Sequence, residues 1–163
     1  GRLASYLGAT YVENHAMSGT ATADLLAQIE KIQRRDYSYI LIQVGGNDVL
    51  GLHNIKRCAK ELGEALALLP QASQILVMSA GNVGGATIFP YPFRPIHTFM
   101  TLKLHKEFGR VCHAHGATYV NLYEPAWKDP FLRDPNRYLS RDGLHPSTYG
   151  YGLWFDVLKK EVR

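Results

Sequence analysis

Short apolar runs typical of buried β-strands alternate with longer segments of helical periodicity along the whole 163-residue chain. The four strand-like runs cover residues 9–14, 37–44, 74–80 and 117–123. The four helix-like segments, in which apolar residues recur every three or four positions, cover residues 22–35, 54–70, 97–115 and 147–162. Alternation of this kind puts helices on both faces of a mostly parallel sheet. The sequence therefore predicts a three-layer α/β fold.

The composition is that of an ordinary globular protein, with 46% hydrophobic and 20% charged residues. The length suits one domain, so we expect residues 1–163 to form a single domain. The net charge is +4, but no Lys/Arg run exceeds two residues, which favours a solvated surface over a nucleic-acid-binding patch. No apolar stretch is long enough to span a membrane. We therefore expect no nucleic-acid partner and no membrane span, and the oligomeric state is not predicted.

The two cysteines, Cys58 and Cys112, lie far apart with no Cys-x-x-Cys spacing. Isolated cysteines of this kind are typically reduced and mostly buried, which favours a cytoplasmic location. The Cys112-x-x-His115 pair has the residue types of a metal site but no second pair of ligands, so a helix end is the better interpretation.

The loop sequence DGLHP near the C-terminus holds a carboxylate, Asp142, three residues before an imidazole, His145. A carboxylate at that spacing can accept the Nδ1–H of the imidazole, which fixes the tautomer and leaves Nε2 free as a base. The plainer alternative is that Asp142 caps the turn and His145 is an exposed polar residue. The motif alone leaves both interpretations open.

Two glycine-containing loops follow the first two strand-like runs, at the sheet edge where parallel α/β folds bind ligands. The loop VGGNDVL could direct the side-chain amide of Asn47 into the crevice. A strand-to-helix turn capped by Asp48 or Asn54 is an equal alternative. Gly19 lies in a turn before the next helix, where a backbone N–H is available to an anion. His53 closely follows the VGGNDVL loop.

Three motifs together resemble the second, third and fifth sequence blocks of the SGNH (GDSL-type) hydrolase family: Gly19, Gly45-x-Asn47-Asp48 and Asp142-x-x-His145. The resemblance covers essentially the whole chain and implies a flavodoxin-like three-layer α/β/α fold. It also implies a lipase- or esterase-like ester hydrolase that transfers the acyl group of a small-molecule ester through a Ser-His-Asp triad. In that scheme His145 is the base and Asp142 orients it, while the Gly19 N–H and the Asn47 amide hold the oxyanion.

The family's first block, Gly-Asp-Ser, supplies the nucleophilic serine at the end of the first strand, and it does not occur in these 163 residues. Residues 1–8 resemble the end of the helix that follows this block, with Gly8 as its cap. We therefore expect the first strand and the nucleophile to precede Gly1, so that the domain is N-terminally incomplete.

The Gly/Pro/aromatic loop over residues 81–96 resembles the variable substrate loop of the family. Val83, Ile88 and Phe89 make this loop apolar, which suits an acyl chain better than a charged substrate, and we expect these three side chains to contact substrate. Deacetylation of a carbohydrate is an open alternative. The resemblance implies no metal and no organic cofactor.

Other nucleophiles and other functions are weaker alternatives. Ser5, Ser18 and Ser79 are interpreted as structural, since none lies in a Gly-x-Ser-x-Gly elbow. A non-catalytic binding module on the same fold is disfavoured by the intact Asp142–His145 pair, which we expect to be buried. A flavodoxin-like nucleotide binder is disfavoured because the chain lacks a glycine-rich phosphate loop.

Overall fold

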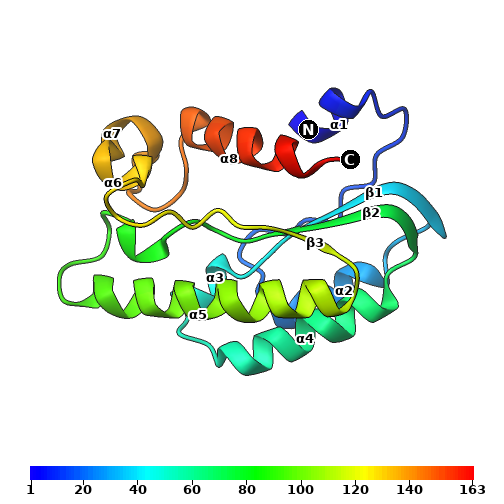
Figure 1. Ribbon diagram of the computed structural model, residues 1–163, viewed down its shortest axis with the longest axis horizontal. Coiled ribbons are helices and arrows are strands. Elements are labelled where there is room, and N and C mark those ends of the chain that lie inside the picture. The colour runs from blue at the N-terminus through cyan, green and yellow to red at the C-terminus, as the bar shows by residue number, and fades with distance from the viewer.

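The computed structural model describes residues 1–163 as helices arranged on both sides of one sheet (Figure 1). The sheet has three strands in the order β1–β2–β3, and both pairings are parallel. The strands are β1 (Asp36–Gln43), β2 (Gln71–Met78) and β3 (Thr118–Val120). The predicted α/β class and parallel sheet are therefore confirmed.

Helices form the outer layers, with α1 and α8 above the sheet and α2, α4 and α5 below it in Figure 1. The α-helices are α1 (Arg2–Leu7), α2 (Leu25–Ile29), α3 (Gly46–Leu50), α4 (Ile55–Leu68), α5 (Phe93–Ala114), α6 (Pro130–Arg133), α7 (Pro135–Tyr138) and α8 (Thr148–Glu161). Two short 3₁₀ helices are η1 (Thr22–Asp24) and η2 (Val83–Gly85).

The long helices predicted over residues 54–70 and 147–162 are confirmed as α4 and α8. Side-chain caps fix both starts, since the Asn54 carboxamide accepts hydrogen bonds from two N–H groups of the first turn and the Ser147 hydroxyl accepts one. Helix α5 begins at Phe93, four residues before its predicted start.

Two predictions in the N-terminal part are corrected. Residues 9–14, predicted as a strand, belong to no strand of the sheet, because they do not pair with β1 and lie across a cavity from it. The helix predicted over residues 22–35 is reduced to η1 and α2, and the chain then turns into β1. In both places, tertiary surroundings decide the structure against local propensity.

The two faces of β1 and β2 differ in how completely they are covered. On the lower face, Ile42 of β1 pairs in register with Val77 of β2, and both are buried. On the upper face, Leu41 pairs in register with Leu76, but Leu76 is 0% exposed whereas Leu41 is 39% exposed. The cover provided by α8 therefore reaches β2 but not the outer edge of β1.

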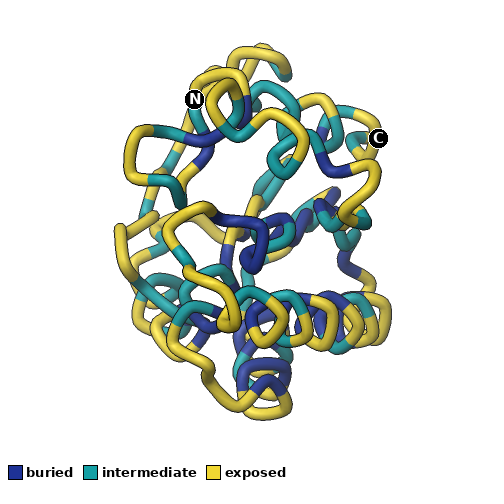
Figure 2. The backbone as a smooth tube through the Cα atoms, turned by 90° about the vertical axis from the view of Figure 1, so that its left-hand side faces the viewer, coloured by how far each residue is buried: buried dark blue, intermediate teal, exposed yellow.

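The main hydrophobic core lies between the sheet and the α4–α5 layer, and it includes Leu62, Leu104 and Phe108, all 0% exposed. A smaller core joins β2 and β3 to α8 through Leu158. Buried segments in Figure 2 run through the sheet and the helices beneath it. Most of the burial that stabilises the fold therefore lies on one side of the sheet.

Cys58 and Cys112 are both buried and unpaired, as predicted. None of the helices combines the length and the apolar character that crossing a membrane requires.

Candidate functional site

A cavity of about 450 Å³ lies at the carboxyl ends of β1 and β2. Its walls come mainly from four segments that are far apart in the sequence: residues 16–20, 43–50, 80–86 and 139–146. Asn47 and His145 both border it. Two predicted site residues from different motifs thus meet at the sheet edge where open α/β folds bind ligands.

His145 and Asp142 form a hydrogen-bonded pair on the loop between α7 and α8. His145 Nδ1 lies 2.6 Å from Asp142 Oδ2. The other carboxylate oxygen, Oδ1, accepts hydrogen bonds from the Ser140 hydroxyl at 2.6 Å and from the Leu144 N–H at 2.9 Å. The turn between the pair passes through Gly143 at a φ of +70°, a conformation that favours glycine. Because Nδ1 is engaged by the carboxylate, Nε2 is the nitrogen left to accept a proton.

The charge of Asp142 is held by local hydrogen bonds. The Ser140 hydroxyl, followed by the Leu144 N–H and the His145 ring and N–H, keeps the pKa of Asp142 well below its usual range. The expectation that the pair is buried is wrong, because the His145 and Asp142 side chains are 64% and 48% exposed. The short turn lies at the surface, so its geometry depends on these hydrogen bonds rather than on burial.

Asn47 is carried by α3, which begins immediately after β1. The turn into α3 requires glycine at Gly45, whose φ is +105° and where a Cβ would lie 2.6 Å from Ser79 Oγ. Asn47 Nδ2 donates one hydrogen to the Thr20 carbonyl at 2.7 Å. A carboxamide nitrogen carries two hydrogens, so the second is available to a ligand in the cavity that Asn47 borders.

Gly19 lies in the turn before η1 at a φ of +78°. Its backbone N–H makes no hydrogen bond within the chain. Ser18 and Thr20 on either side of it border the cavity, although Gly19 itself does not line it. The bond from Asn47 to Thr20 joins this turn to α3, so the two predicted oxyanion donors belong to one connected unit.

Asp48 is 1% exposed, and its side chain connects neighbouring segments of the chain by hydrogen bonds instead of capping a helix. Its Oδ2 accepts hydrogen bonds from the Thr22 N–H at 3.0 Å and the Thr22 hydroxyl at 2.8 Å. Its Oδ1 accepts one from the Cys58 thiol at 3.2 Å and lies 3.2 Å from His53 Nδ1. Burial, together with the hydrogen bond to Asp48, raises the pKa of the Cys58 thiol to about 12. Asp48 thus connects η1, α3 and α4 directly behind Asn47.

The three side chains predicted to contact substrate lie in different surroundings. Val83 of η2 borders the cavity, whereas Ile88 and Phe89 do not. Ile88 is 54% exposed, and the Phe89 ring stacks on the His97 ring with centroids 4.1 Å apart. The rest of the apolar wall includes residues to which the sequence analysis assigned no role: Leu50, Ala86, Phe131, Leu139, Leu144 and Trp154.

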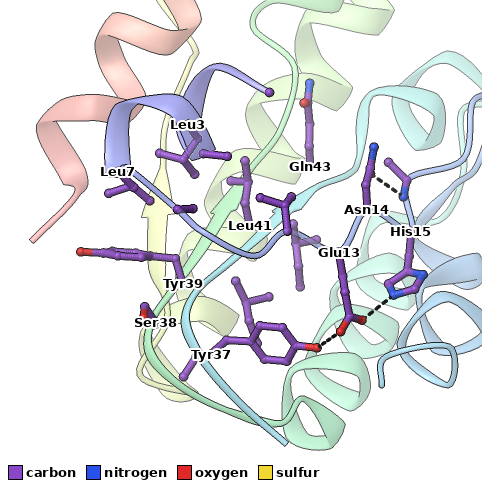
Figure 3. A pocket seen from close by; sticks show the side chains of 18 of the residues that line it. Leu3, Leu7, Glu13, Asn14, His15, Tyr37, Ser38, Tyr39, Leu41 and Gln43 are labelled. Carbon is purple, nitrogen blue, oxygen red and sulfur yellow. Dashed lines mark hydrogen bonds and ion pairs between the residues drawn. The ribbon is translucent and has the colours of Figure 1, made fainter. Parts of the chain in front are cut away.

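A second, larger cavity of about 1400 Å³ lies along the free edge of β1 (Figure 3). Strand β1 forms one wall and residues 8–17 form the opposite one, and α1, α2, α8 and parts of β2 also contribute to the lining. Leu3 and Leu7 of α1 point toward the same space as Tyr39 and Leu41 of β1. The cavity therefore has an apolar lining along a strand edge whose backbone groups are unpaired.

Glu13 fixes the outer wall of this larger cavity to the start of β1 (Figure 3). Its carboxylate accepts hydrogen bonds from the Tyr37 and Tyr11 hydroxyls, each at 2.8 Å, and from the Gln33 N–H at 3.2 Å. His15 Nε2 lies 3.0 Å from the same carboxylate. The His15 ring and these donors lower the pKa of Glu13 to about 2. Side-chain bonds, not a backbone ladder, hold this wall beside the strand.

The two cavities adjoin at the carboxyl end of β1, where Met17, Gln43 and Trp154 line both. The Trp154 indole Nε1–H is buried there and has no hydrogen-bond partner in the chain. An unsatisfied buried donor costs about 1–3 kcal/mol, so an acceptor is expected at this junction. This buried donor could not be predicted from the sequence, because Trp154 lies among other apolar residues of α8.

Two further residues of the candidate site, Thr20 and Ser140, were not identified from the sequence. Thr20 accepts the hydrogen bond from Asn47 through its backbone carbonyl, a group that every residue type has. Ser140 could have been found, since a hydroxyl two residues before an aspartate on a tight loop often bonds to it. None of the chain's serine hydroxyls is hydrogen-bonded to His145; Ser18 borders the smaller cavity, and Ser79 is buried beneath Gly45.

Comparison with known proteins gives one family match and several similar structures. The model of the "GDSL-like Lipase/Acylhydrolase family" matches residues 1–153. Comparison with curated proteins gives no match.

Three solved structures illustrate the similarity of fold. A lipase/acylhydrolase from Enterococcus faecalis has a TM-score of 0.66 and 22% identity, over 88% of this chain and 71% of that one. A psychrotrophic esterase from Pseudoalteromonas sp. has a TM-score of 0.61 and 17% identity, over 99% and 81%. An acetylxylan esterase from Geobacillus stearothermophilus has a TM-score of 0.62 and 19% identity, over 89% and 68%. At these identities the likeness is one of fold, which agrees with the predicted hydrolase architecture.

Proposed function

The chain belongs to the GDSL-like lipase/acylhydrolase family, and from this premise we propose that it is a carboxylic ester hydrolase that transfers an acyl group to a serine and then to water. His145 takes the proton from the serine hydroxyl and returns it to the leaving alcohol, while Asp142 fixes its tautomer. The Asn47 amide and the Gly19 N–H stabilise the tetrahedral oxyanion. The observation that carries the proposal is the 2.6 Å His145–Asp142 pair on the cavity that Asn47 also borders.

The nucleophile, in this proposal, comes from a further strand of the longer polypeptide that lies in the larger cavity parallel to β1. Three features support this position. The edge of β1 is unpaired, the cavity exceeds the roughly 300–1,000 Å³ of small-molecule pockets, and Trp154 Nε1 lacks an acceptor at its end. A parallel strand in this cavity ends where β1 ends, beside Met17 and Gln43, and so delivers its last residue to the smaller cavity.

The substrate, in this proposal, is a small ester with a short to medium acyl group. The smaller cavity combines an apolar wall, including Val83 and Leu144, with polar groups such as Asn82 and Asp129. This mixed lining also keeps carbohydrate O-deacetylation as a second candidate, supported by the fold shared with an acetylxylan esterase. Comparing hydrolysis of p-nitrophenyl esters of increasing acyl length with release of acetate from acetylated xylo-oligosaccharides separates the two candidates.

The test of the catalytic pair uses the full-length native protein and p-nitrophenyl acetate. We expect His145→Ala to lower kcat by about 10⁴-fold or more, and His113→Ala, an exposed histidine at the end of α5, to leave it unchanged. Activity should fall about tenfold per pH unit on the acid side, because only neutral imidazole accepts a proton, while Asp142 stays ionised. Equal, measurable activity of His145→Ala and wild type, with both folded, would remove His145 from the mechanism, whereas no activity in the folded wild type would favour a binding module on the same fold.

A further inference from the structure

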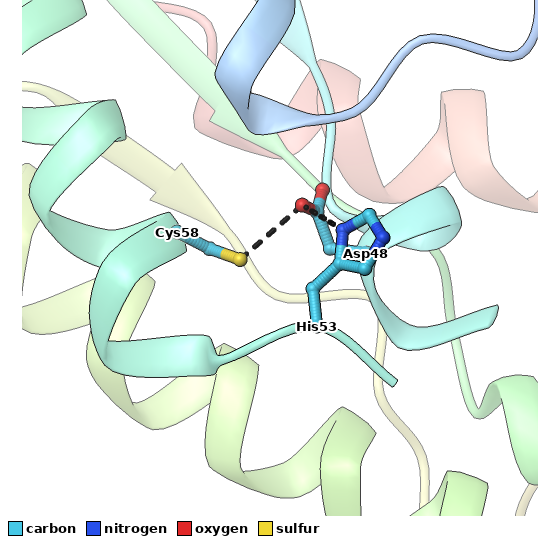
Figure 4. A group of neighbouring side chains, drawn as sticks. All are labelled: Asp48, His53 and Cys58. Atoms are coloured by element: carbon cyan, nitrogen blue, oxygen red, sulfur yellow. Dashed lines mark hydrogen bonds and ion pairs between the residues drawn. The ribbon is translucent and has the colours of Figure 1, made fainter. Parts of the chain in front are cut away.

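Asp48, His53 and Cys58 bring three kinds of metal-ligating atom together outside the proposed catalytic pair (Figure 4). Each of the three residues offers one ligand atom, and these atoms all lie within 4.8 Å of one another. Asp48 Oδ1 is 3.2 Å from His53 Nδ1 and 3.2 Å from Cys58 Sγ. Both side chains therefore converge on a single carboxylate oxygen.

The two 3.2 Å separations resemble those between neighbouring ligand atoms of one tetrahedral ion. Zinc bonds of about 2.0 Å to oxygen and nitrogen and about 2.3 Å to sulfur place neighbouring ligand atoms roughly 3.3–3.5 Å apart. We propose that Asp48 Oδ1, His53 Nδ1 and Cys58 Sγ form a Zn²⁺ site, with a water molecule as the fourth ligand. The third separation, between the His53 and Cys58 ligand atoms, lies within 4.8 Å, and rotation of the half-exposed His53 side chain toward the sulfur completes the geometry.

The Asp48 carboxylate is already oriented for this role. Its second oxygen, Oδ2, is held by the N–H and hydroxyl of Thr22, so Oδ1 alone changes partner when a metal binds. Outer hydrogen bonds of this kind typically fix a ligating carboxylate. Two hydrogen bonds to Oδ1 are exchanged for one metal bond, and the connection between η1 and α3 is kept.

The donor set and the exposure of its members favour a borderline-soft cation. A thiolate and an imidazole suit Zn²⁺ or Co²⁺, whereas Mg²⁺ and Ca²⁺ prefer oxygen ligands. The His53 side chain is 48% exposed, while that of Asp48 is 1% exposed and Cys58 is 2% exposed. A metal ion can therefore approach through the side of His53 and be held against two buried ligands.

Binding is balanced by the loss of one proton. The Cys58 S–H bond breaks as the sulfur–metal bond forms, and that proton passes to solvent. The imidazole binds in its neutral form through Nδ1, with its own proton on Nε2. The metal joins α3 to the start of α4, so we also expect Zn²⁺ to raise the Tm of the protein.

The test is a Co²⁺ titration of the full-length native protein, kept reduced. We expect a near-ultraviolet thiolate-to-cobalt charge-transfer band that saturates at one Co²⁺ per chain and disappears when Zn²⁺ is added. Cys58→Ser should abolish the band, and Cys112→Ser, which changes the other buried free cysteine, should retain it.

A second variant keeps the proposal testable if Cys58→Ser does not fold. His53→Gln changes a half-exposed residue and should weaken Co²⁺ binding at least about tenfold while circular dichroism stays native. The absence of a charge-transfer band in the wild type, its persistence in Cys58→Ser, or unchanged affinity in His53→Gln would each overturn the assignment.

Discussion

Leu41 and Ile42 are neighbours on β1, yet the two faces of the strand meet very different surroundings. Ile42 and its register partner Val77 are both buried against the α4–α5 layer. Leu41 is 39% exposed, although its partner Leu76 is 0% exposed on the same upper face. Leu41 lines the larger cavity, and so do Leu3 and Leu7 of α1 opposite it. The lower face of β1 is therefore covered, whereas its upper face is left partly exposed at the free edge of the sheet.

The smaller cavity contrasts with this partly exposed face of β1. Asn47 is bonded to Thr20, and His145 is bonded to Asp142. Both bonds are made by side chains and backbone groups within residues 1–163. The proposal that a further strand brings the nucleophilic serine therefore concerns the larger cavity, and the predictions below test it.

The largest effect is expected from alanine at the two register partners, in the full-length native protein. If a strand covers Leu41, then Leu41→Ala and Leu76→Ala should each lower the free energy of unfolding by about 2–5 kcal/mol. If the edge of β1 stays open, Leu41→Ala should cost less than about 1 kcal/mol and only Leu76→Ala should be severe. Denaturant unfolding of both variants distinguishes these outcomes.

The next effect concerns the donor beside the junction of the two cavities. Asn47→Ala should lower kcat on p-nitrophenyl acetate by about 10²–10³-fold with little change in KM, because the amide acts mainly on the oxyanion. Asn136 of α7 is exposed and does not border the cavity, so Asn136→Ala serves as the control. A selective rise in KM for Asn47→Ala, with kcat preserved, would assign Asn47 to substrate binding instead.

The smallest effect is expected at Glu13, which ties the outer wall of the larger cavity to Tyr37. Its pKa is about 2 in the folded protein against a usual 4.5, so its stabilisation is fully present above about pH 4.5 and is lost as the pH falls toward 2. Glu13→Gln should therefore lower Tm at pH 6, and the difference from wild type should shrink toward pH 2–3. A Tm difference that is independent of pH would show that the charge of the Glu13 carboxylate does not stabilise the fold.

The sequence was most informative where function depends on side chains in short motifs. Spacing drew attention to Asp142, His145 and Asn47, and the structure brings the last two to one cavity and the first two into contact. The strand predicted at residues 9–14 was wrong, since pairing depends on a neighbour that local pattern does not report. The Thr20 carbonyl and the Trp154 indole belong to the candidate site only because of their tertiary positions, which a sequence pattern does not predict.

The central claim is that a serine from outside residues 1–163 reaches His145 through the larger cavity. The direct measurement is labelling of the full-length native protein with a fluorophosphonate, followed by peptide mass spectrometry. The account predicts one labelled serine at the end of a strand beyond these residues, with labelling lost in His145→Ala and kept in Ser18→Ala. Labelling of Ser18, which borders the smaller cavity, or of any other serine within residues 1–163 would contradict it.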